Sequence, residues 1–178
     1  GTKFFLVGLP DNAIKESQQR LMAAFKNVGY RMPGMKIVVN MAPADIRKEG
    51  SAYDLTIGMG ILAASGQIPS EGIGDYIIMG ELSLDGNVLP IKGALPIAIQ
   101  AAKENFKGFF LPKENAREAA IVSGLEVYGV ENIKEVIDFF SGNSTPERVT
   151  VNILEEFEKV QSHMEFDFSD VKGQENIK

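Results

Sequence analysis

The chain has 178 residues, 44% of them hydrophobic, which is enough for one ordinary core and a short appendage. It has no cysteine and one histidine, His163, so disulfides, thiolate metal sites and histidine-rich metal sites are excluded. The net charge of −6 divides into +4 for residues 1–50 and −10 for the remainder. This asymmetry fits either a basic, anion-facing end on an acidic body or a set of solvated helix and loop faces.

Neither a membrane span nor a secretory leader is indicated by the sequence. No apolar run reaches the roughly 18 residues that a membrane helix needs, and the first residues lack a signal-peptide pattern. We therefore expect a cytoplasmic protein that makes no membrane contact.

The first part of the chain predicts a strand, a helix and a second strand. Residues 4–7 form an apolar run typical of a strand. Residues 11–28 carry apolar side chains at helical spacing behind a Pro-Asp-Asn start signal. Residues 35–41 predict the next strand, and residues 44–51 predict a polar loop.

Residues 55–65 are apolar on nearly all sides, which favours a buried central helix. Gly58 and Gly60 would permit close packing there, despite their cost to helix propensity. Asp54 lies near the start of this helix. We expect it to stabilise the helix N-terminus, where a carboxylate is favoured, and the alternative is a polar group of a functional cleft.

The second part of the chain predicts a hairpin followed by alternating helices and strands. Two strands, at residues 76–84 and 88–91, flank an Asp-Gly turn. Helices at residues 95–105, 114–123 and 132–140 then alternate with strands at 109–111 and 125–130, which favours parallel pairing at one sheet edge. Residues 141–146 predict a linker and residues 154–160 a short helix. The predicted fold class is α+β, a mixed sheet with packed helices.

Residues 80–112 resemble the proteolytic domain of Lon proteases in their order of strand, Asp-Gly turn, strand, helix and strand. In that domain a serine and a lysine form the catalytic pair, and the matching places here hold Ala52 and Ile97. A serine–lysine nucleophile needs a hydroxyl and a neutral amine within hydrogen-bond reach. The resemblance therefore implies the Lon fold with no catalytic residues. A relocated pair of Ser51 and Lys92 is the alternative.

Residues 167–178 resemble the opening of an AAA+ ATPase module. In that superfamily a Val-x-Gly-Gln element lies against the adenine base, and the matching positions are Val171, Gly173 and Gln174. No Gly-x-x-x-x-Gly-Lys-Ser/Thr phosphate loop occurs in the chain. The expected division is a Lon-like domain at residues 1–141, a linker at 142–166 and the truncated start of an AAA+ module at 167–178. We expect these residues by themselves to hold no cofactor and no metal.

A Lon-like domain without its dyad that leads into an AAA+ module resembles the N-terminal domain of the ComM (YifB) competence-protein family, which are Mg-chelatase-like ATPases. The segments that carry the match include residues 7–11, 15–17, 39–44, 53–55 and 80–93. The resemblance implies a ribosomal-protein-S5-domain-2-like fold whose first strand precedes Gly1. It also implies a full-length protein that binds ATP and Mg²⁺, forms a homo-oligomeric, hexameric ring with its own AAA+ module, and acts as a DNA helicase in branch migration.

The basic side chains of the first fifty residues are candidate contacts to DNA phosphates, because lysine and arginine supply most sequence-independent DNA affinity. Arg47 and Lys48 form the best pair, since they lie on a loop beside the position where Lon proteases have the serine. The other candidates are Lys15, Arg20, Arg31 and Lys36. The sequence thus predicts a non-catalytic module that helps a hexameric ATPase to assemble or to grip DNA. The alternatives are a pure oligomerisation or partner-docking platform and, less favoured, an active peptidase.

Overall fold

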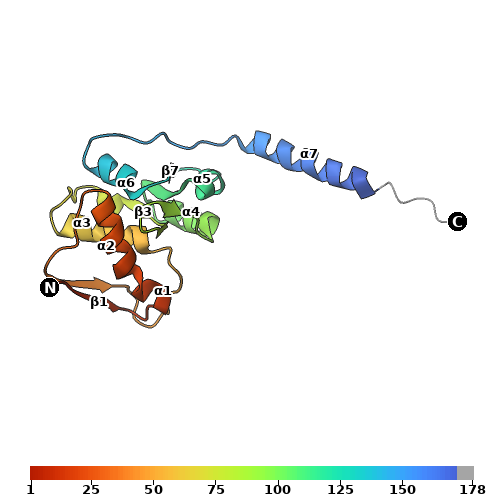
Figure 1. Cartoon of the computed structure of the whole chain (residues 1–178). Coiled ribbons are helices and arrows are strands. Elements are labelled where there is room, and N and C mark those ends of the chain that lie inside the picture. The colour runs from red at the N-terminus through yellow and green to blue at the C-terminus, as the bar shows by residue number, and fades with distance from the viewer. Residues whose placement is uncertain (172–178) are drawn as a thin grey trace.

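The computed structural model describes residues 1–171, with side chains described to residue 164, and opens with a parallel strand pair (Figure 1). Strand β1 (Lys3–Val7) and strand β2 (Lys36–Asn40) are joined by helices α1 (Asn12–Lys15) and α2 (Ser17–Asn27) and pair in parallel. Alternate side chains of the two strands pack against the core, and the remaining ones stay on the surface. The strands and the helical segment were all predicted from the sequence.

The predicted helix at residues 11–28 is interrupted at Glu16, where α1 ends and α2 begins. The backbone of Glu16 remains right-handed helical, so the predicted buried stripe is kept. Ile14 from α1 and Leu21 and Phe25 from α2 are all buried in one core.

Helix α3 (Asp54–Ala64) is the buried central helix that the sequence predicts. Gly58 permits close packing, because an added Cβ would lie 2.8 Å from Cδ2 of Leu21 on α2. The same expectation is wrong for Gly60. A Cβ at Gly60 would meet no atom within 4 Å, so this glycine faces open space.

Three parallel strands form a sheet that is covered on both faces. Strands β3 (Tyr76–Ile78), β6 (Gly108–Pro112) and β7 (Glu126–Val130) lie in the order β3-β6-β7. Helices α4 (Ala94–Lys103) and α5 (Lys113–Ala120) pack on one face, while α6 (Ile133–Phe140) packs with α2 and α3 on the other. This sheet confirms the predicted parallel pairing of the last strands. It is preceded by the short 3-10 helix Ile73–Asp75.

The strand predicted at residues 76–84 is divided into β3 and β4 (Glu81–Leu82) by Gly80. The Gly80 amide donates to the Ala52 carbonyl at 2.8 Å, and its carbonyl accepts from the Leu55 amide at 2.9 Å. Gly80 therefore pairs with the start of α3 instead of a neighbouring strand. The predicted hairpin is present but short. Strand β4 pairs with β5 (Val88–Leu89) through two residue pairs, Glu81 with Leu89 and Leu82 with Val88.

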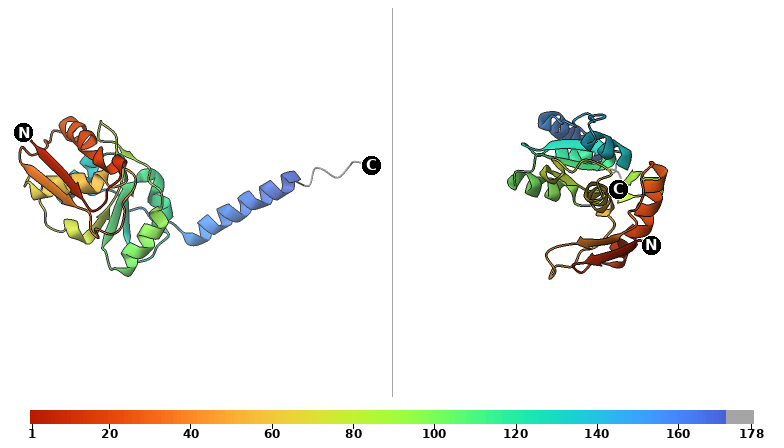
Figure 2. Two further views of the ribbon diagram at one scale, coloured as in Figure 1. Left: turned by 90° about the horizontal axis from the view of Figure 1, so that it is seen from below. Right: turned by 90° about the vertical axis from the view of Figure 1, so that its left-hand side faces the viewer.

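The α+β fold class is confirmed, and within residues 1–171 the strands are divided among three small sheets, β1-β2, β3-β6-β7 and β4-β5. The C-terminal helix is longer than predicted. Helix α7 (Ile153–Val171) begins where the Asn152 side-chain oxygen accepts from the Leu154 amide, and neither proline nor glycine follows before residue 173. Figure 1 and the left view of Figure 2 show α7 leading away from the body on the side opposite to β1.

The Asp11 carboxylate ties α1 to the loop before α3. It caps α1 by accepting from the Ile14 amide at 2.9 Å, and it accepts from the Gly50 amide at 2.8 Å. Partial burial disfavours the charged form, but these two hydrogen bonds and the nearby Arg47 charge lower the pKa of Asp11 below its ordinary value.

We expect Asp11→Asn, which keeps a capping oxygen but removes the charge, to lower stability in a pH-dependent way. Because the pKa of Asp11 is lowered in the folded chain, the carboxylate stabilises the fold above its unfolded value of about 3.9. That contribution is lost as the pH falls through the folded value. Urea midpoints of the variant and wild type should therefore differ at about pH 7 and converge near about pH 2. An unchanged gap at acid pH would contradict this assignment.

Candidate functional site

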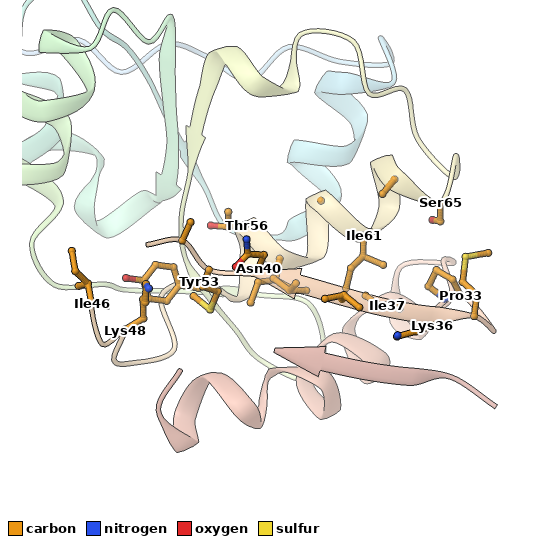
Figure 3. A pocket seen from close by; sticks show the side chains of 18 of the residues that line it. Pro33, Lys36, Ile37, Asn40, Ile46, Lys48, Tyr53, Thr56, Ile61 and Ser65 are labelled. Atoms are coloured by element: carbon orange, nitrogen blue, oxygen red, sulfur yellow. The ribbon is translucent and has the colours of Figure 1, made fainter. Parts of the chain in front are cut away.

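A groove of about 900 Å³ lies between β2 and α3 (Figure 3). One wall is β2. Among the described strands, β2 pairs with β1 alone, so its other edge is not paired with a described strand. The other wall is the face of α3 that carries Thr56, Gly60 and Ala64, each separated by one helical turn. The loop at residues 42–48 closes one end, and Pro33 and Ser65 mark the other end in Figure 3.

Sequence reasoning did not anticipate this groove. The sequence does contain a signal for one wall of the groove: small residues at four-residue spacing on a largely apolar helix. These residues are Thr56, Gly60 and Ala64. Such a spacing indicates one face that large side chains leave open. It does not tell which element lies opposite.

The two positions that the resemblance assigns to the Lon dyad both border one apolar core. Ala52 precedes α3 and Ile97 lies on α4, and both pack, partly buried, against the cluster that fills the α4 and α5 face of the sheet. An alanine and an isoleucine offer neither a hydroxyl nor an amine. By this resemblance, the chain has packed apolar side chains at the positions where Lon proteases have the catalytic serine and lysine.

Ser51 and Lys92, the alternative pair, have separate surroundings. The Ser51 hydroxyl donates to Oε2 of Glu81 at 2.5 Å. The Lys92 side chain is exposed in the turn before α4. An exposed lysine is not the desolvated amine that a serine nucleophile needs.

Asp54 has a structural role at the start of α3, as the sequence predicts, and its main partner comes from α2. Its side chain is 1% exposed. The Arg20 guanidinium donates to both carboxylate oxygens, at 2.6 and 2.9 Å, and the Leu82 amide donates at 3.0 Å. Burial raises the pKa of the Asp54 carboxyl against the opposing effect of these hydrogen bonds. The hydrogen bond to Asp54 raises the pKa of Arg20, which keeps some contact with water.

Two of the candidate DNA contacts are engaged inside the fold, which corrects the predicted set. Arg20 is held by Asp54 and by the Ala13 carbonyl, so its guanidinium is not free for a phosphate. Lys48 is 8% exposed. Its Nζ donates to the Gly8 carbonyl at 2.8 Å and also to the Pro43 carbonyl. The sequence placed Lys48 on a polar loop but could not show that the loop folds its lysine inward.

The remaining candidates, Lys15, Arg31, Lys36 and Arg47, are exposed. Lys36 and Arg47 line the groove. The Lys36 ammonium lies 5.5 Å from the ring centre of Phe5, and Arg47 pairs with Glu49 at 3.2 Å across a solvent-exposed bridge. The charged residues in the groove lining are Lys36, Arg47 and Lys48, and no aspartate or glutamate is among the lining residues.

The predicted adenine-side residues cannot be placed. Gly173 and Gln174 lie outside the described residues, and the side chain of Val171 is not described. Within the described part of the chain, no three His, Asp or Glu side chains gather into a group that could hold a metal ion. No described helix has both the length and the apolarity needed to cross a membrane.

Comparison with known proteins identifies the family. Residues 1–115 match the family described as "Subunit ChlI of Mg-chelatase". The chain belongs to this Mg-chelatase-like family. Competence protein ComM of Haemophilus influenzae is 35% identical over 175 residues, which cover 98% of this chain and 34% of ComM. Protein YifB of Escherichia coli is 35% identical over 173 residues, covering 97% of this chain and 33% of YifB.

Lon proteases are more distant relatives of this ChlI-type chain. Lon protease 2 of Bacillus subtilis is 29% identical over 142 residues, which cover 78% of this chain and 25% of the protease. The resemblance to ComM and YifB and the weaker one to Lon are thus confirmed. The chain spans about a third of the length of ComM and YifB.

We expect Asp54→Ala to destabilise the chain by about 3–5 kcal/mol, because it leaves a largely buried guanidinium without its partner. Urea unfolding would measure this effect. Lys113→Ala is the matched control, since Lys113 pairs with Glu131 on the surface at 2.9 Å, and its urea midpoint should not change. Equal effects of the two substitutions would contradict the anchoring role of Asp54.

Proposed function

We propose that this chain is a non-catalytic N-terminal domain that helps a ring-forming AAA+ ATPase of the ComM and Mg-chelatase-like family to assemble and to grip DNA. The carrying observation is the replacement of both dyad positions by packed apolar side chains, Ala52 and Ile97, in a member of this family. In this proposal the full-length protein acts on DNA in the cytoplasm as a hexameric helicase. ATP and Mg²⁺ then belong to the AAA+ module, because this chain has no phosphate loop.

Support for a DNA contact comes from the exposed cations beside the groove. Lys36 and Arg47 lie along one hollow without a carboxylate in its lining, and Arg31 and Lys15 lie on the surface of the same half of the chain. A phosphate backbone is attracted by such cations without any base-specific contact. The exposed ring of Phe5 lies 5.5 Å from the Lys36 ammonium.

A second candidate function is a pure oligomerisation or partner-docking platform with no nucleic-acid contact. The unfilled apolar groove and the exposed apolar side chains of α7 favour this candidate. Both candidate functions describe a domain without catalytic activity. They differ in what the exposed cations contact.

We expect fluorescence anisotropy to detect binding of this chain to single- and double-stranded DNA that weakens steeply as salt is raised. The double variant Lys36→Glu, Arg47→Glu should lower the affinity and reduce the slope of log K against log salt by roughly one for each phosphate that the variant no longer binds. Lys103→Glu, an exposed lysine at the end of α4, is the matched control and should have little effect. No binding at low salt would support the docking platform instead.

We expect no release of peptides from unfolded casein by this chain. Ala52 and Ile97 supply no nucleophile or base, and Ser51 donates its hydroxyl to Glu81. Peptide release that disappears in Ser51→Ala would show a relocated dyad and overturn the non-catalytic assignment. Release that persists in Ser51→Ala would indicate a contaminating protease.

A further inference from the structure

Helix α7 exposes an apolar stripe that its own domain does not cover. Phe157 is 63% exposed and Val160 is 57% exposed. With Ile153 and Met164 they follow spacings of four, three and four residues, which places all four on one face of the helix. Residues 153–164 contain three glutamates and one lysine; helical spacing places Glu156 beside the stripe and Glu155 and Glu158 toward the opposite face. This is the pattern of an amphipathic, acidic helix that docks in an apolar groove.

The groove between β2 and α3 has the complementary properties. Its lining is mostly apolar, its charged residues are Lys36, Arg47 and Lys48, and it contains no acidic residue. The α3 wall is built from Thr56, Gly60 and Ala64, and small side chains allow a second helix to approach closely. Helix α3 has eleven residues, about 16 Å of helix, which matches the length of the stripe on α7.

The contacts at the start of α7 hold this helix away from the groove of its own chain. The Val149 amide donates to the Val127 carbonyl at 2.8 Å, which fixes this residue at the edge of β7. Arg117 on α5 pairs with Glu156 in the first turn of α7. The step from Val149 to Ile153 can span at most roughly 14 Å. Figures 1 and 2 show α7 leaving the body on the side away from β1 and β2.

We propose that α7 of one copy of this chain docks in the groove between β2 and α3 of a second copy, with its apolar stripe on α3. The two surfaces are different parts of the chain, so the contact is head-to-tail. Repeated contacts of this kind close into a ring or extend into a filament. The inference rests on the assembly part of the proposed function and assigns that part to named surfaces.

Two substitutions separate the two surfaces. Gly60→Leu fills the groove, and the fold tolerates it because an added Cβ at Gly60 meets no atom within 4 Å and leucine favours a helix. Phe157→Asp breaks the stripe on α7 at a position with 63% exposure. Met22→Asp, on the exposed face of α2, is the matched control. Circular dichroism melts would check that all three variants are folded.

Sedimentation velocity over a concentration series of the whole chain tests the contact. We expect wild type and Met22→Asp to self-associate, and Gly60→Leu and Phe157→Asp each to weaken association at least ~10-fold in Kd. A mixture of Gly60→Leu and Phe157→Asp should form one-to-one pairs, because the open groove of the second variant can accept the intact helix of the first. Energy transfer between differently labelled variants would detect those pairs.

The proposed docking is overturned if wild type is monomeric throughout, or if it self-associates equally well with either substitution. It is also overturned if Gly60→Leu alone weakens association, since the groove would then hold a segment other than α7, such as an extended strand paired with β2. If neither substitution changes the self-association, the docking proposal fails but the proposed assembly role can still be fulfilled by other surfaces. The DNA titration addresses the other part of the proposed function independently.

Discussion

The Asp54 carboxylate is buried where three elements meet, and the geometry of the site depends on its hydrogen bonds. It is carried by α3, it accepts from Arg20 on α2, and it accepts from the Leu82 amide on β4. The backbone of Gly80 adds two hydrogen bonds at the same junction, to Ala52 and Leu55. Helix α3 forms one wall of the groove, and Ala52 lies two residues before its first residue. The hydrogen bonds of Asp54 and Gly80 therefore position both the groove wall and Ala52. A buried carboxylate of this kind is stable only while its donors stay in place.

Local pattern was sufficient to predict most of the elements and the parallel pairing of β6 with β7, because burial repeats with the period of each element. It was not sufficient for contacts between distant residues. Arg20 and Asp54 are 34 residues apart, and nothing in the spacing of either residue indicates the other. Lys48 appeared on a polar loop in the sequence, but its neighbours include the Gly8 carbonyl, 40 residues away. The charge of a side chain is visible in a sequence, whereas its partner is not.

Ala52 and Ile97 occupy the positions that the resemblance to Lon proteases assigns to the dyad. A serine–lysine pair requires a neutral amine held in a desolvated place, and such polar groups are costly to bury. Ala52 and Ile97 have no polar side-chain group to bury, and both pack at the edge of an apolar core. The hydroxyl of Ser51 forms a hydrogen bond to Glu81 at the same junction. Tyr53, the residue after Ala52, lines the groove between β2 and α3, so that groove adjoins the Ala52 position.

Strand β6 belongs to both cores at once. Phe110 packs among Tyr76, Tyr128 and Phe139 on one face of the sheet, while Phe109 lies in the cluster under α4 and α5. Adjacent residues of a strand point to opposite faces, so neither cluster can open without exposing a side chain of the same five-residue segment. The two halves of the molecule therefore unfold as one cooperative unit. The amides of β6 should be the last in the chain to exchange with solvent.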